Sequence, residues 1–122
     1  MILYMDEYAM YLRKSRADAQ AEMLGEGETL ARHKKILTDL AAKLNIHVAK
    51  IYQEIVSGET IEARDEIQQL IKDCYAGMYK GIIVIEVTRL SRGNQGDAQI
   101  IMDCLKYGNN GQGILVVTPT KV

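Results

Sequence analysis

The fold is decided by the stretch Gly81-Ile82-Ile83-Val84-Ile85-Glu86-Val87, an almost unbroken run of apolar, mostly β-branched residues. Such a run is typical of a strand that is covered on both faces, because a strand with one wet face alternates apolar and polar residues. We therefore predict a central strand here, with helices above and below the sheet that contains it.

Further strand and helix patterns flank this stretch on both sides. We predict other strands over Tyr8–Arg13, Ile46–Ile55 (with an irregularity around Lys50) and Gly113–Thr118. We predict helices from about Thr29 to a left-handed stop at Asn45, from about Glu62 to Gly77, and from Asp97 as N-cap to Gly108. The polar segment 16–28 is expected to be a mobile loop.

The alternation of these patterns predicts the fold class. Strands that alternate with helices form βαβ units, so we expect an α/β fold with three layers. Its central sheet should be mainly parallel, with about four or five strands and helices on both faces. A chain of 122 residues has a normal size for one domain, which we assign to residues 1–122.

Composition limits the function classes. The formal net charge is −1, so any affinity for nucleic acid must come from a local basic cluster or from another domain. We find neither an apolar run of transmembrane length nor a signal peptide at the start. Cys74 and Cys104 lack metal-ligand spacing and are expected to be buried thiols. We therefore expect a cytoplasmic protein without a metal, a cofactor or a membrane partner.

Arginines and serines gather where two predicted strands end. The first strand closes with Tyr11-Leu12-Arg13-Lys14-Ser15-Arg16, and Thr88-Arg89-Leu90-Ser91-Arg92 follows the third. Strand ends on one edge of an α/β sheet converge, and such folds keep their sites there. Guanidinium groups can hold phosphate oxygens while a hydroxyl attacks a phosphodiester. Solvated basic turns are also common, so the residues alone leave both interpretations open.

A further arginine belongs to the same kind of edge. Arg64 follows the turn Ser57-Gly58-Glu59-Thr60, where the second strand gives way to a helix. The alternative is a surface arginine paired with Glu62 or Asp65, which would contribute little energy.

Together, these segments resemble the serine recombinases: resolvases, invertases and the large integrases and transposases. The Tyr11-x-Arg13-x-Ser15 segment is similar to the nucleophile strand of that family. Ser57-Gly58 with Arg64, and Arg89-Leu90-Ser91-Arg92, resemble its other two motifs, in the same order along nearly the whole chain. The long segment after Arg16 is more similar to the large serine recombinases.

The resemblance implies a function and a mechanism. Ser15 would attack the DNA backbone to give a 5′-phosphoserine link, with Arg13, Arg64, Arg89 and Arg92 holding the phosphate oxygens. Tyr11, Arg16, Thr88 and His33 would support the site or contact DNA phosphates. The partners implied are double-stranded DNA carrying att-like or res-like sites and, in the full-length protein, further copies forming a dimer and a synaptic tetramer. The chain is then expected to be a fragment that lacks the DNA-binding domains and is inactive alone.

Two positions depart from the family pattern. Thr88 stands where the family has Asp, and His33 aligns with a typical Gln. Because Arg32, Lys34 and Lys35 surround His33, we expect it on a basic helix face in solvent. Thr88 leaves open a degenerate module for dimerisation or regulation. A nucleotide- or phosphate-binding doubly-wound domain is a further alternative, although no Gly-rich phosphate loop supports it.

Overall fold

The fold comes from a computed structural model, which describes residues 7–14, 30–55, 65–86 and 95–119. The elements are β1 (Glu7–Lys14), α2 (Leu30–Leu44), β2 (His47–Ile55), α3 (Asp65–Tyr75), β3 (Gly81–Ile83), α4 (Gln95–Tyr107) and β4 (Leu115–Val117). The strands pair in parallel in one sheet of order β2-β1-β3-β4. The predicted α/β fold with a parallel central sheet is confirmed, and the sheet has four strands.

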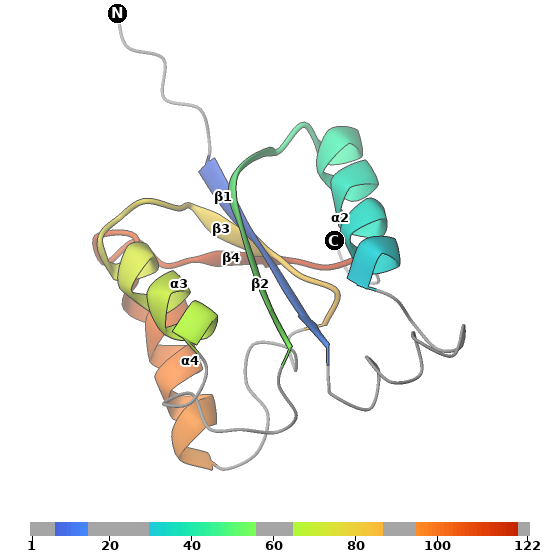
Figure 1. Cartoon of the computed structure of the whole chain (residues 1–122). Helices are drawn as coiled ribbons and strands as arrows, with labels where there is room; N and C mark the ends of the chain where they lie inside the picture. The colour runs from blue at the N-terminus through green and yellow to red at the C-terminus, as the bar shows by residue number, and fades with distance from the viewer. Residues whose placement is uncertain (1–6, 15–29, 56–64, 87–94, 120–122) are drawn as a thin grey trace, which may run out of the picture.

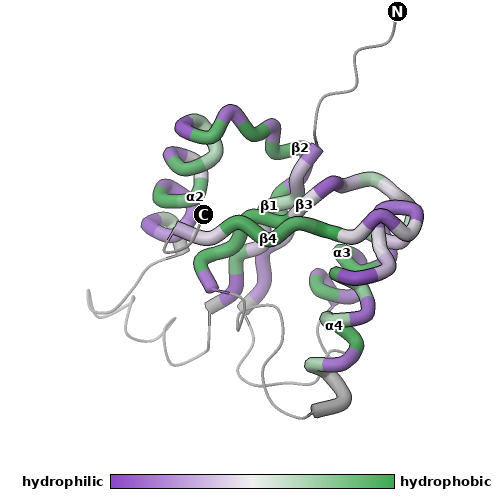
Figure 2. The backbone as a smooth tube through the Cα atoms, turned by 180° about the vertical axis from the view of Figure 1, so that it is seen from behind, coloured by the Kyte–Doolittle hydropathy of each residue, from purple (hydrophilic) through white to green (hydrophobic). Residues whose placement is uncertain are grey.

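The domain has three layers (Figure 1). Helix α2 covers one face of the sheet, and α3 and α4 lie together on the other. The tube in Figure 2 is most hydrophobic along β3 and β4 and alternates along the helices, as expected for helices that bury one stripe. Helices on both faces, as the sequence predicted, explain why the inner strands are apolar on both sides.

Strand β1 is the centre of this arrangement. Its side chains alternate, so Ala9 and Tyr11 join the core beneath α3 and α4. Met10 and Leu12 join the smaller core beneath α2. All four side chains are buried. Because β2 and β3 pair with β1 on its two sides, this strand is enclosed in every direction.

An irregularity in β2 decides which of its residues face each core. Tyr8 pairs with Val48 and Ala9 pairs with Lys50, so Ala49 is an extra residue opposite the register shift. After this bulge Tyr52 points into the core with Tyr11, whereas Ile51 is 39% exposed. The irregularity predicted around Lys50 is confirmed.

Close packing at the start of β3 requires a glycine. A Cβ at Gly81 would lie 2.4 Å from the ring atom Cε2 of Tyr8 and 2.9 Å from the carbonyl oxygen of Leu115. The helix stops behave as expected, because Asn45 and Gly77 adopt the left-handed φ values 60° and 82°.

Several predicted boundaries were wrong. Helix α4 begins at Gln95, so Asp97 lies within its first turn and is not the N-cap. Strand β3 ends at Ile83 and does not reach Val87, although the following residue Val84 is fully buried. Strand β4 covers only Leu115–Val117 of the predicted range Gly113–Thr118, and Leu115 is 52% exposed. It is an edge strand, because no further strand in the described part of the chain pairs with it. The expected loop 16–28 and the expected helix start near Glu62 lie outside the described residues.

Both cysteines are buried and free, as predicted. Cys74 on α3 and Cys104 on α4 belong to the same core, and their shared hydrogen bond together with burial raises the pKa of the Cys74 thiol. Within the described ranges, no helix is long and apolar enough to span a membrane.

A polar network ties β2 to α3 inside the larger core. The hydroxyl of Tyr52 donates to Oδ2 of Asp73, and the hydroxyl oxygens of Tyr52 and Tyr79 are 2.6 Å apart. The two rings meet edge to face at 88°, with centroids 6.1 Å apart. Gln69 donates to the other Asp73 oxygen at 2.9 Å. The network provides hydrogen-bond partners for two buried hydroxyl groups, which the surrounding apolar side chains could not provide.

Replacing Tyr52 with Phe should lower the free energy of unfolding by about 1–3 kcal/mol, because the variant leaves the buried Tyr79 hydroxyl without its partner. Urea denaturation measures the change. Tyr107→Phe is the control, because that side chain is exposed and its loss should change stability by less than about 0.5 kcal/mol. Equal stability of the two variants would contradict the role assigned to the network.

Stability should also fall in alkali through Tyr52. Burial, reinforced by its bonds with Asp73 and Tyr79, raises the pKa of Tyr52 above the ordinary value of 10. The unfolded state loses this proton near pH 10, whereas the folded state keeps it. The stabilisation is therefore complete below about pH 10 and decreases as the pH rises above it. Urea titrations at a series of pH values measure the difference in free energy of unfolding between wild type and Tyr52→Phe, which should become smaller from about pH 10 upward. If this difference stays constant up to about pH 11.5, the role assigned to the Tyr52 proton is wrong.

Candidate active site

The candidate site lies at the carboxyl ends of the strands, which share one edge because all strand pairs are parallel. Arg13, the last residue but one of β1, is only 2% exposed. By alternation along β1, its side chain is on the face that carries Tyr11. A guanidinium presents its donors in a planar fork that matches the oxygens of a phosphate or carboxylate.

Tyr11 supports this end of β1 from within the core. It is fully buried, and its hydroxyl donates to Oε1 of Glu54 on β2. A donor in this position fixes the rotamer of Glu54. The sequence assigned Tyr11 a supporting place, and the structure brings it onto the same strand face as Arg13.

Glu54 is a residue that the sequence analysis missed. It is the register partner of Arg13 on the adjacent strand. Its second oxygen, Oε2, accepts a hydrogen bond of 3.2 Å from the backbone N–H of Glu66, the second residue of α3. The first N–H groups of a helix have no partner within the helix, so the carboxylate caps α3 and meets the positive end of its dipole.

Glu54 therefore joins three elements: β1 through Tyr11, β2 through its own backbone, and α3 through Glu66. One signal in the sequence could have identified it, since Glu54 is the only carboxylate of the predicted strand Ile46–Ile55 and stands three residues before Ser57. Its face could not be inferred, because the bulge at Ala49 shifts the alternation by one residue.

The expected placement of His33 was wrong. Its side chain is only 7% exposed and does not lie on a solvated face. His33, Leu37 and Ala41 are four residues apart and are all buried, so they form the stripe of α2 that packs against the sheet. The prediction relied on the basic neighbours of His33, but adjacent residues of a helix point in different directions, so exposed neighbours do not imply an exposed His33.

The other predicted site residues lie outside the described residues: Ser15, Arg16, Arg64, Thr88, Arg89 and Arg92. In chain order, residues 15 and 16 directly follow β1, residue 64 directly precedes α3, and residues 88–92 fall between β3 and α4. The described part thus brings together Tyr11, Arg13 and Glu54, with His33 on the opposite face of the sheet.

Other parts of the described surface differ from the carboxyl edge as possible sites. A pocket of about 1000 Å³ lies at the opposite edge of the sheet between residues such as Glu7, Lys80 and Gln112. No cluster of three or more His, Cys, Asp or Glu that could hold a metal ion occurs among the described residues. Arg13 and Glu54 lie at the carboxyl edge, as register partners on neighbouring strands.

A family comparison agrees with this arrangement. Residues 8–117 match the family model described as "Resolvase, N terminal domain". This chain belongs to the resolvase N-terminal domain family. The match covers every described strand except the first residue of β1, together with all the segments that carry the three arginine motifs.

Solved structures share the fold of this resolvase-family chain. The C-terminal catalytic domain of ISC1926 TnpA, an IS607-like serine recombinase, has a TM-score of 0.66 at 18% identity, covering 92% of this chain and 68% of that one. The N-terminal catalytic domain of TP901-1 integrase has a TM-score of 0.68 at 18% identity, covering 93% and 77%. A resolvase family site-specific recombinase from Streptococcus pneumoniae has a TM-score of 0.63 at 21% identity, covering 92% and 70%. At these identities the likeness concerns the fold.

Replacing Glu54 with Ala should lower the free energy of unfolding by about 1–2 kcal/mol, because it removes the acceptor of the Tyr11 hydroxyl and the cap of α3. Thermal or urea unfolding measures this. The control is Gln53→Ala on the exposed side of the same strand, expected within about 0.5 kcal/mol of wild type. If the two variants are equally stable, Glu54 does not join the three elements as described.

Proposed function

We propose that this resolvase-family chain is the catalytic domain of a serine-type site-specific DNA recombinase. The observation that carries the proposal is the buried guanidinium of Arg13, at the carboxyl end of the central strand and two residues before Ser15. A buried arginine two residues before a serine hydroxyl suits transfer of a phosphoryl group, because its guanidinium can stabilise the charge that develops on the phosphate. Family membership supports the same chemistry.

In the proposed reaction, Oγ of Ser15 attacks a phosphorus atom of the DNA backbone. The new bond joins Oγ to phosphorus, and the bond from phosphorus to the 3′ oxygen breaks. The serine proton leaves, and the 3′ oxygen takes up a proton as a free hydroxyl. The 5′-phosphoserine link keeps the phosphodiester energy, so reversal on a new 3′ hydroxyl rejoins strands without ATP.

Arg13, Arg64, Arg89 and Arg92 are proposed to hold the non-bridging oxygens as charge builds up on them. Arginine stays protonated at neutral pH, so these residues stabilise charge and do not act as bases. Glu54 and Tyr11 are proposed to keep the Arg13 strand and the start of α3 in register, so that guanidinium groups from both can meet one phosphate. Removing a single such donor in an enzyme commonly costs about 10²–10³ in rate.

The proposed partner is double-stranded DNA, bound by a dimer that pairs into a tetramer. A domain with a formal net charge of −1 supplies little general affinity for DNA. We therefore propose that most DNA binding and assembly belongs to segments of the full-length protein outside residues 1–122.

The deciding experiment uses the full-length gene product and its DNA site. Protease digestion and mass spectrometry should find a nucleotide attached to Ser15, and Ser15→Ala should lower strand cleavage by roughly 10⁴-fold or more. Tyr107→Phe, which removes an exposed hydroxyl from α4, is the matched control and should cleave normally. Cleavage that persists in Ser15→Ala shows that Ser15 is not the nucleophile.

One sequence feature favours a second candidate. Thr88 replaces the acidic residue that the family motif carries, which fits a degenerate module used for dimerisation or regulation. The same experiment separates the two. A wild-type protein that binds its site and forms no covalent link supports the degenerate module.

A further inference from the structure

The two faces of the sheet differ in charge. Helix α2 carries four cationic side chains and one carboxylate: Arg32, Lys34, Lys35, Lys43 and Asp39. On the opposite face, α3 has one lysine and three carboxylates, and the described side chains of α4 include one lysine, Lys106, and one carboxylate, Asp103. A chain that is nearly neutral as a whole therefore has a basic helix, α2, on one side of the sheet and an acidic helix, α3, on the other.

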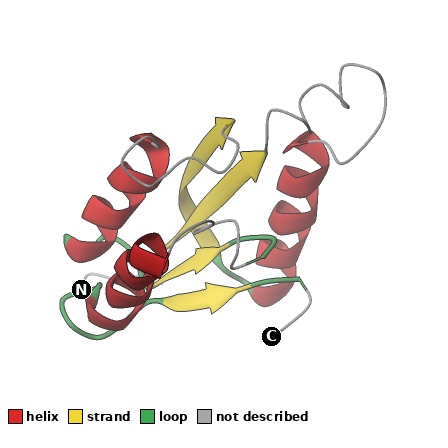
Figure 3. Ribbon diagram, turned by 90° about the horizontal axis from the view of Figure 1, so that it is seen from below, coloured by secondary structure: helices red, strands yellow, loops and turns green. Residues whose placement is uncertain are grey.

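The basic side chains of α2 are concentrated near its start. Arg32, Lys34 and Lys35 are exposed, whereas His33 between them turns inward against the sheet. In a right-handed βαβ connection the helix runs back along the strands, so α2 begins near the carboxyl edge that holds Arg13. At 1.5 Å per residue, Lys35 lies only about 8 Å along the helix from Leu30. Figure 3, seen from below, shows α2 and the α3–α4 pair on opposite sides of the strands.

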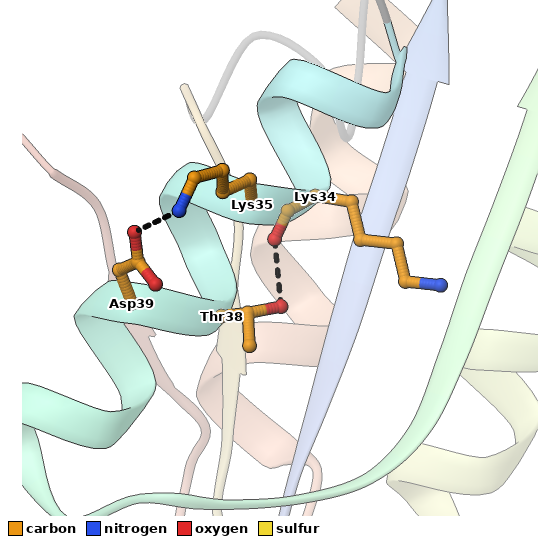
Figure 4. A network of polar contacts seen from close by, with 4 residues as sticks. All are labelled: Lys34, Lys35, Thr38 and Asp39. Atoms are coloured by element: carbon orange, nitrogen blue, oxygen red, sulfur yellow. Dashed lines mark hydrogen bonds and ion pairs between the residues drawn. The ribbon is translucent and has the colours of Figure 1, made fainter.

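The two lysines are available for an anionic partner. Lys35 pairs with Asp39 at 3.2 Å, but the side chains are 77% and 68% exposed, and such an exposed pair is weak and easily exchanged. Figure 4 shows the Lys34 side chain extending away from the helix on the side of the strands. Among the described residues, its ammonium group forms no ion pair.

We infer that the backbone of duplex DNA leaves the catalytic edge along α2, where Lys34 on the strand side of the helix and Lys35 on its exposed surface contact the phosphates. This inference rests on the proposed function and adds the path of the substrate. A duplex carries one negative charge per 1.7 Å of its axis, so it extends far beyond the single phosphate held at Arg13. The carboxylates of α3 and α4, including Asp65 and Glu66 in the first turn of α3, repel that charge on the other side.

The inference is tested by the salt dependence of DNA binding. Chain 1–122 is titrated into a fluorescently labelled duplex of about 20 base pairs, and anisotropy is followed from low to moderate ionic strength. The double variant Lys34→Gln with Lys35→Gln should reduce the slope of log K against log salt by about 2, since each lost phosphate contact contributes about 0.9.

The matched control removes the same charge from the other face, through Lys72→Gln with Lys106→Gln. It should leave the slope within about 0.5 of wild type, because α3 and α4 are not in the path. If the slope decreases equally in both double variants, the effect is one of overall charge and the inference is overturned. An unchanged slope in the α2 variant, or no binding by wild type even at low salt, overturns it as well.

A second measurement locates the contact directly. Amide shifts of the isotope-labelled chain on addition of duplex should appear at the catalytic edge and in residues 30–44, and should spare residues 68–75 and 98–107, which follow the first turns of α3 and α4. Shifts in residues 68–75 and 98–107 without shifts in residues 30–44 refute the path. The outcome is independent of the cleavage chemistry. If Ser15→Ala still forms a covalent link while the α2 variant shows the reduced salt slope, the assignment of the nucleophile is wrong and the DNA path along α2 is supported. If Ser15→Ala abolishes the covalent link and the salt slope of the α2 variant equals that of wild type, only the DNA path along α2 is wrong.

Discussion

The whole structure depends on burying β1 on both faces and along both edges. Its alternating side chains join two separate cores, one under α2 and one under α3 and α4, and β2 and β3 satisfy its backbone groups on either side. A strand enclosed in this way has little freedom to shift, because a slip of one residue would move every side chain to the wrong core. The rigidity is passed to Arg13 at the end of the strand, which is held where the chain leaves the sheet.

Glu54 links this rigid strand to the start of α3. A single carboxylate accepts one hydrogen bond from Tyr11 on β1 and another from the first turn of α3, while its own backbone is part of β2. The segment that joins β2 to α3 carries Arg64, and the segment after β1 carries Ser15. Anchoring the elements beside both segments to one side chain limits how far the ends of these elements can move apart.

The charge distribution gives this small domain a basic side without making it basic overall. Separating four cations on α2 from the carboxylates on α3 and α4 gives the molecule a preferred side, although its net charge is close to zero. The same separation comes from the three-layer fold, because helices on opposite faces of a sheet can present different charges without cancelling each other at short range.

The sequence by itself determined the α/β class, the parallel sheet with helices on both faces, the helix stops at Asn45 and Gly77, and the bulge near Lys50. These follow from local patterns of apolar residues and from backbone preferences, which short stretches of sequence carry. Only the tertiary structure decided that His33 is buried, that Leu115 belongs to an exposed edge, and that Glu54 joins Tyr11 to α3. These depend on which strand lies beside which and on the face that each residue takes after the bulge. Such facts arise from contacts between segments far apart in the chain, where neighbouring residues give no guidance.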